Sequence, residues 1–147
     1  MAMKRLLPAL FAALAPCLPA AAQPAAASAA RFDGAWDVTM SCPPHDGDVD
    51  DDAKGYTHRF PAQVIDGQLA ATHRKEGEPG WHFLHGRIRP DGDAALRLDG
   101  IVNNPRYAIN DAPRGKPYSY RVKAHFDEAS GSGQRLTGRI CEFRFTR

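Results

Sequence analysis

Tyr118-Ser119-Tyr120-Arg121-Val122-Lys123-Ala124-His125-Phe126 is the clearest strand pattern in this 147-residue chain. Its apolar and aromatic side chains stand at every second position, with polar side chains between them. Because successive side chains of a strand point to opposite faces of a sheet, this period of two predicts a strand with one buried face. The stretch therefore points to the all-β class.

The same alternation recurs along most of the chain, and it is strong over 36–42 and 94–102. Asp66-Gly67 and Asp91-Gly92 supply turn residues for hairpins, whereas 129–133 is predicted to be a loop. Beyond the N-terminal segment, no stretch keeps the spacing of an amphipathic helix. The predicted strands cover 35–42, 56–65, 68–74, 81–89, 94–102, 117–126 and 135–146, with a short eighth candidate at 106–109.

The N-terminal segment has the three parts of a secretory signal peptide. Lys4 and Arg5 precede an apolar run over 6–15, and three alanines end at Ala22, before Gln23. So short an apolar run is unable to span a membrane. We predict a signal peptide over 1–22, a flexible leader over 23–30 and an antiparallel β domain over 31–147, located in the periplasm or secreted. Leu14 to Cys17 resembles a lipoprotein box, but Pro16 stands where such a box has a small residue.

The formal charge of +2 comes from the predicted signal peptide. Removal of Lys4 and Arg5 leaves equal numbers of basic and acidic residues, so the predicted mature chain is neutral. A neutral chain lacks the electrostatic footprint of a nucleic-acid-binding protein. We therefore expect no nucleic-acid partner.

Two cysteines, Cys42 and Cys141, remain after the predicted cleavage. In an exported chain two cysteines favour one disulfide, with two buried free thiols as the alternative. Their pairing would bring the first and last strands together, as closure of a barrel requires. The sequence thus predicts a single small antiparallel β-barrel of seven or eight strands, with a β-sandwich as the alternative.

Two positions predict departures from regular strands. Pro61 lacks an N–H group, so the strand over 56–65 needs a bulge or an unpaired edge there. In the strand over 135–146 the apolar phase changes between Ile140 and Cys141, which predicts a bulge.

Gly34-x-Trp36 stands at the start of the first predicted strand, and Arg144 stands in the last. This arrangement resembles the calycin group of small up-and-down barrels, which includes lipocalins, avidins and bacterial periplasmic protease inhibitors. The resemblance implies structural roles: Trp36 would plug one barrel end and Arg144 would pack across it. It also implies that the leader over 25–31 could enter a protease cleft. The stretch 115–120 is similar to uncharacterised exported bacterial β domains and implies no function.

Five aspartates between Asp46 and Asp52 imitate the start of a calcium-binding loop. The EF-hand pattern fails, however, because Asp51 stands where that loop requires glycine. We interpret this segment as a solvated acidic loop.

Three histidines form a candidate zinc site. A hairpin that turns at Asp66-Gly67 places His73 opposite Phe60 and diagonal to His58, and a matching register of the next strand places His82 opposite His73. Three imidazoles are a donor set suited to zinc. Since a slip of one residue would disperse them, the alternative is three rim histidines without a metal, and the prediction includes no cofactor.

No nucleophile or phosphate-binding motif is recognisable, so we expect the chain not to be an enzyme. Its predicted function is an exported, monomeric, non-catalytic binding domain for a small apolar ligand. The alternatives are a protein-binding domain such as a periplasmic protease inhibitor, a metal-dependent enzyme, or a structural role in the envelope. Several aromatic residues either line a ligand cavity or fill the core: Tyr56, Trp81, Tyr107, Tyr118 and Tyr120.

Overall fold

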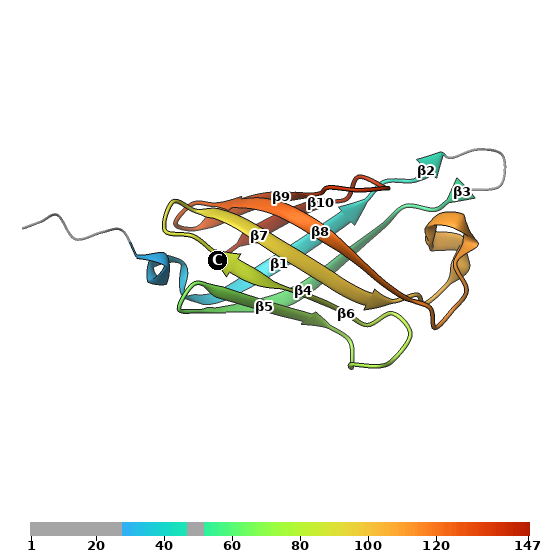
Figure 1. Ribbon diagram of the computed structural model, residues 1–147, viewed down its shortest axis with the longest axis horizontal. Helices are drawn as coiled ribbons and strands as arrows, with labels where there is room; N and C mark the ends of the chain where they lie inside the picture. The colour runs from blue at the N-terminus through green and yellow to red at the C-terminus, as the bar shows by residue number, and fades with distance from the viewer. Residues whose placement is uncertain (1–27, 47–51) are drawn as a thin grey trace, which may run out of the picture.

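The computed structural model describes residues 28–46 and 52–147, and these contain eight antiparallel strands that close into a barrel (Figure 1). Each strand pairs with the next along the chain, and the last returns to the first. This confirms the predicted antiparallel barrel and shows that the sandwich alternative is wrong. The barrel strands are β1 (Gly34–Cys42), β4 (Tyr56–Ile65), β5 (Gln68–His73), β6 (His82–Ile88), β7 (Asp93–Ile101), β8 (Pro117–Phe126), β9 (Ser130–Arg135) and β10 (Glu142–Thr146).

The two ends of the barrel differ. Figure 1 shows the 3-10 helix η1 (Ala29–Phe32) at one end, which we name the plugged end. At the opposite end, the loop end, lie the two-stranded sheet β2 (His45–Asp46) and β3 (Asp52–Ala53) and the segment with η2 (Pro105–Tyr107) and η3 (Ile109–Asp111). Among the described residues, no helix has the length and apolar character needed to cross a membrane.

Aromatic side chains fill the plugged end. Phe32 from η1 is fully buried and lies edge-on against Phe126, with ring centroids 6.2 Å apart. Trp36 meets the same Phe126 ring at 5.4 Å, and its Nε1–H donates to the Phe32 carbonyl at 2.8 Å. The barrel is therefore a packed core at this end, and Trp36 is part of that core.

The arginine that covers Trp36 is Arg147, which corrects the expectation for Arg144. The Arg147 guanidinium carbon lies 4.9 Å from the Trp36 ring centroid, and its nitrogens donate to the carbonyls of Asp33 and Arg31 at 2.9 and 3.1 Å. Arg144 is exposed. Its neighbours Phe143 and Phe145 face the core, so the alternation of the strand turns Arg144 outward.

Strand β9 occupies the region predicted to be a loop, and two glycines explain why its pattern was hidden. Its partly buried positions, beside the inward-facing residues of β8, are Gly131, Gly133 and Arg135, so two of the three are glycines and the third is charged. A Cβ at Gly133 would lie 2.8 Å from the Cβ of Ala124, and one at Gly131 would lie 3.1 Å from the Phe126 ring. The inner face of β9 therefore lacks the apolar side chains on which the alternation depends.

The predicted strand over 135–146 is wrong in its first half, because the chain leaves β9 at Arg135 and enters β10 only at Glu142. The change of phase near Cys141 thus marks a loop over 136–141 and not a bulge. The short candidate at 106–109 is also wrong, since η2 and η3 occupy that segment.

Pro61 lies within β4, paired with Asp37 of β1. On its other side, β4 pairs with β5 only from Ala62 onward. Pro61 therefore sits where the ladder to β5 has ended, in agreement with the predicted unpaired edge.

Cys42, the last residue of β1, forms a disulfide with Cys141, which directly precedes β10. This confirms the predicted pairing. The predicted signal peptide with Cys17, the leader up to residue 27, and Asp48, Asp50 and Asp51 lie outside the described residues. Of the predicted leader, 28–30 are described: Ser28 caps η1 by accepting a hydrogen bond from the Ala30 N–H at 3.2 Å.

Candidate functional site

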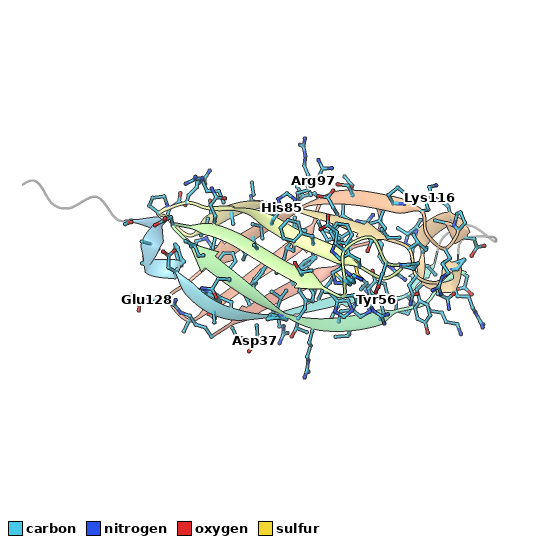
Figure 2. All side chains as sticks on the ribbon, turned by 90° about the horizontal axis from the view of Figure 1, so that it is seen from below. Asp37, Tyr56, His85, Arg97, Lys116 and Glu128 are labelled. Atoms are coloured by element: carbon cyan, nitrogen blue, oxygen red, sulfur yellow. A yellow bond between two sulfur atoms is a disulfide. The ribbon has the colours of Figure 1, made fainter. Side chains whose placement is uncertain are left out.

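The loop end holds a cavity of about 430 Å³. Strands β4 and β8 supply three of its tyrosines, and the segment between β7 and β8 covers it with Tyr107 and Ile109. In Figure 2, Tyr56 lies toward the same end as Lys116, whereas Glu128 lies toward the plugged end. The lining residues are Tyr56, His58, Gly80, His82, Ile101, Val102, Asn103, Asn104, Tyr107, Ala108, Ile109, Ala112, Tyr118, Ser119, Tyr120, Arg135 and Arg139.

Tyr118 and Tyr120 form one wall of the cavity. Their rings are stacked, with centroids 6.1 Å apart. Tyr118 packs over Gly100 on the neighbouring strand, where a Cβ would lie 2.4 Å from the Tyr118 Cζ. Gly100 thus provides the space that the Tyr118 ring needs, which no side chain at that position would leave.

The phenols of Tyr56, Tyr118 and Tyr120 remain protonated at neutral pH. Burial raises the pKa of Tyr56 and Tyr118, and it raises the pKa of Tyr120 well above its ordinary value. A protonated phenol can donate a hydrogen bond as well as accept one. The Tyr120 hydroxyl donates to the Met40 Sδ at 3.4 Å, deep in the barrel.

Two arginines, Arg135 and Arg139, place positive charge at the cavity. The Arg135 guanidinium carbon lies 4.2 Å from the Tyr120 ring centroid, and that of Arg139 lies 5.4 Å from the Tyr56 ring centroid. The Nε atoms of both arginines are buried without a hydrogen-bond partner. None of the described residues that line the cavity is acidic, so this charge has no carboxylate partner within the lining.

Arg139 also fixes the covering segments. It is 3% exposed and donates to the carbonyls of Ala53, Lys54 and Tyr107 at 2.8, 2.6 and 3.2 Å. Because it lies two residues before the disulfide at Cys141, the loop that carries it is anchored to the end of β1. Neither Arg135 nor Arg139 belongs to a motif that marks it in the sequence, and the only signal for Arg139 is its closeness to that cysteine.

His58, His73 and His82 meet on the inner face near the loop end, as the sequence predicted. His73 is paired directly with His82, and the β4–β5 register is the one expected from the Asp66-Gly67 turn. The three rings are nearly parallel, with centroids 4.6 Å apart for His58 and His73, 5.2 Å for His58 and His82, and 4.6 Å for His73 and His82. One potential ligand atom from each residue lies within 4.8 Å of the other two.

Burial and mutual repulsion keep these imidazoles neutral. Burial, together with the neighbouring His73 and Arg74, lowers the pKa of His58 to about 4. Burial lowers the pKa of His82 to about 3, and burial and Arg74 also lower the pKa of His73. The cluster is therefore a set of neutral nitrogen donors at physiological pH.

Trp81 is not one of the residues that line the cavity, contrary to the expectation for it. It directly precedes His82, whose side chain is 2% exposed and faces the interior. Trp81 lies outside β6, so the alternation of that strand does not direct its side chain inward. Tyr56, Tyr107, Tyr118 and Tyr120 do line it.

Comparison of the chain with protein-family models, with curated proteins and with solved structures finds no match.

Proposed function

We propose that this protein is exported and binds a small aromatic or apolar molecule with an anionic group in the cavity at the loop end. The observation that carries the proposal is the cavity of about 430 Å³ with four tyrosines and two arginines in its lining. Ligand cavities in proteins are typically of about 300–1,000 Å³, with apolar and aromatic walls and a few convergent polar groups.

The composition of the lining supports this class of ligand. The Tyr118 and Tyr120 rings provide flat surfaces for stacking against an aromatic or apolar group. Arg135 and Arg139 have unpaired Nε atoms and no carboxylate beside them in the lining, so an anionic group would gain charge-assisted hydrogen bonds there. A purely apolar ligand, as expected from the sequence, would leave both arginines without an anionic partner in the cavity lining.

Export is supported by the predicted signal peptide over 1–22 and by the Cys42–Cys141 disulfide, since disulfides persist mainly in oxidising compartments. A calycin-like origin is supported by the closed barrel of eight strands and by the position of Trp36 at the plugged end. The protein is expected to act as a monomer.

Two fluorescent probes with the same aromatic frame test the proposal. 8-Anilinonaphthalene-1-sulfonate carries a sulfonate, whereas N-phenyl-1-naphthylamine is neutral. We expect the folded protein to bind the anionic probe more tightly, and Tyr118→Ala to weaken both probes. Arg135→Gln should reduce affinity for the anionic probe by roughly tenfold, in line with the loss of a charge-assisted hydrogen bond, and leave the neutral probe unchanged.

Arg121→Gln is the matched control, because Arg121 is an exposed residue of β8 outside the cavity lining. Circular dichroism of each variant shows that the barrel is folded. If neither probe binds the folded protein, or if Tyr118→Ala affects neither, the proposal is wrong. The protein-binding alternative, such as a protease inhibitor, would then be tested by titrating the protein into protease assays.

A further inference from the structure

We infer that His58, His73 and His82 bind one divalent transition-metal ion, with Zn²⁺ as the best match, at the wall of the cavity. Neutral imidazole is a preferred ligand of Zn²⁺, Ni²⁺ and Cu²⁺, whereas Ca²⁺ and Mg²⁺ prefer oxygen. The inference does not rest on the proposed organic ligand, because the ion would be held by the three histidines alone.

Unpartnered nitrogens are the first observation that carries this inference. His82 is 2% exposed, and its Nε2 is buried without a hydrogen-bond partner. The Nδ1 of His58 is buried and unpartnered as well. Buried polar atoms without partners are rare in proteins, because each has lost its hydrogen bonds to water. A bound cation would give both nitrogens a partner.

The backbone registers hold the donors together and are the second observation. His73 and His82 are direct cross-strand partners, and His58 stacks on both at centroid distances of 4.6 and 5.2 Å. The ligand atoms already lie within 4.8 Å of one another. Two nitrogens bound tetrahedrally to Zn²⁺ at about 2.0–2.1 Å are about 3.4 Å apart. The nitrogens therefore need to approach one another by little more than about 1 Å, which rotation of the side chains can supply.

The position of the cluster leaves room for a further ligand. His58 and His82 also line the cavity of about 430 Å³. Three histidines and one open position are typical of zinc sites that bind water or an exchangeable ligand, whereas purely structural sites use four protein ligands. An ion held here would therefore present its open position to the cavity.

Arg74 is the charged group whose repulsion would weaken binding of the ion. Its positive charge contributes to the lowered pKa of all three histidines, which places it within electrostatic reach of each of them. A cation at the cluster would experience the same repulsion. Arg74→Gln keeps a side chain of similar length and removes the charge, so it should tighten metal binding by roughly two- to tenfold.

Calorimetric titration of the metal-free protein with Zn²⁺ alone tests the inference. We expect one ion per chain, and we expect Co²⁺ at the same site to give the visible absorption of a low-symmetry complex with nitrogen ligands. His73→Ala should weaken Zn²⁺ binding by more than the roughly 10–100-fold loss that follows removal of an outer-shell partner. His73 is half-buried, so this variant should fold.

His125→Ala is the control, because His125 is an exposed histidine of β8. His58→Gln gives a second test if His73→Ala is poorly folded by circular dichroism. The inference is overturned if the wild-type protein binds no Zn²⁺, or if the folded His73 and His58 variants bind it as tightly as the wild type. It is also overturned if His125→Ala abolishes binding. None of these results depends on the two fluorescent probes.

Discussion

The disulfide between Cys42 and Cys141 joins the two strands that close the barrel. Cys42 ends β1, and Cys141 directly precedes β10, with their Cα atoms 4.2 Å apart across a sequence separation of 99 residues. The β1–β10 ladder begins beside it, where Ser41 is paired with Glu142. The bond therefore secures the one pairing in the barrel that links the two chain ends.

Removal of this disulfide should destabilise the whole barrel. In the chain-entropy model, a closed loop of about 100 residues contributes up to about 4.7 kcal/mol, because the unfolded chain loses freedom. We expect Cys42→Ser combined with Cys141→Ser to lower the free energy of unfolding in guanidinium chloride by about 2–4 kcal/mol. Reductant should weaken the wild type and have no effect on the double variant. Equal unfolding midpoints for the two proteins would contradict this role.

Arg147 should matter for stability, and Arg144 should not. Arg147 covers the Trp36 ring and donates to the carbonyls of Asp33 and Arg31, whereas Arg144 is an exposed residue of the same strand region. Arg147→Ala should lower the free energy of unfolding by about 1–2 kcal/mol through lost hydrogen bonds and cation–π contact. Arg144→Ala should change it by less than about 0.5 kcal/mol. If urea unfolding shows a larger loss of stability for Arg144→Ala than for Arg147→Ala, then Arg147 is not the arginine that stabilises the plugged end.

The inner glycines of β9 should be intolerant of a side chain. A Cβ at Gly133 would lie 2.8 Å from the Cβ of Ala124, whereas Ser132 is exposed on the other face. Gly133→Ala should therefore destabilise the protein by about 1–3 kcal/mol through overpacking. Ser132→Ala, one residue away, should be nearly neutral. Thermal unfolding of both variants checks this, and similar melting temperatures would mean that the interior has spare room.

Stability should fall in mild acid because of the histidine cluster. The pKa of His82 is about 3 in the folded protein against 6.5 for an ordinary histidine, so below pH 6.5 the unfolded chain binds more protons. The stabilisation by neutral His82 is complete above that pH and is lost as the pH falls toward 3. Each pH unit in this window costs at most about 1.4 kcal/mol. His58, with a pKa of about 4, adds a smaller effect because it is only half-buried.

Urea unfolding between pH 7 and pH 4.5 with EDTA present measures this slope. His82→Gln should flatten the dependence of the unfolding free energy on pH, whatever its effect on absolute stability. An unchanged slope in that variant would show that His82 does not keep its depressed pKa in the folded state.

Alternation and turn residues were sufficient to predict most of the strands. The predicted bounds of 56–65 and 117–126 match β4 and β8, because both strands have one face of polar and one of apolar residues. Strand β9 was not predicted because its inward positions are two glycines, which leave space for neighbouring side chains, and the charged Arg135. Apolar periodicity is unable to detect a strand that contributes no apolar side chain to its inner face.

The candidate site likewise contains residues that could be predicted from the sequence and residues that could not. The histidine cluster followed from the sequence, because an Asp-Gly turn sets the register of a hairpin and the register sets which side chains meet. The arginines of the cavity did not follow, since Arg139 reaches it from an irregular loop. Trp81 was misplaced because the strand begins only at His82, so the alternation expected over 81–89 does not apply to it.

The sequence by itself determined the all-β class and the juxtaposition of the three histidines, because these depend on local periodicity and on short turns. It also predicted the cysteine pair, because only two cysteines remain in the predicted mature chain. Only the tertiary structure decided that the sheet closes between β1 and β10, that Arg147 covers Trp36, and that a cavity remains at the loop end. Those features depend on how side chains from distant parts of the chain fill a shared volume. Such packing leaves no periodic pattern in the sequence, so these features could not be predicted from it.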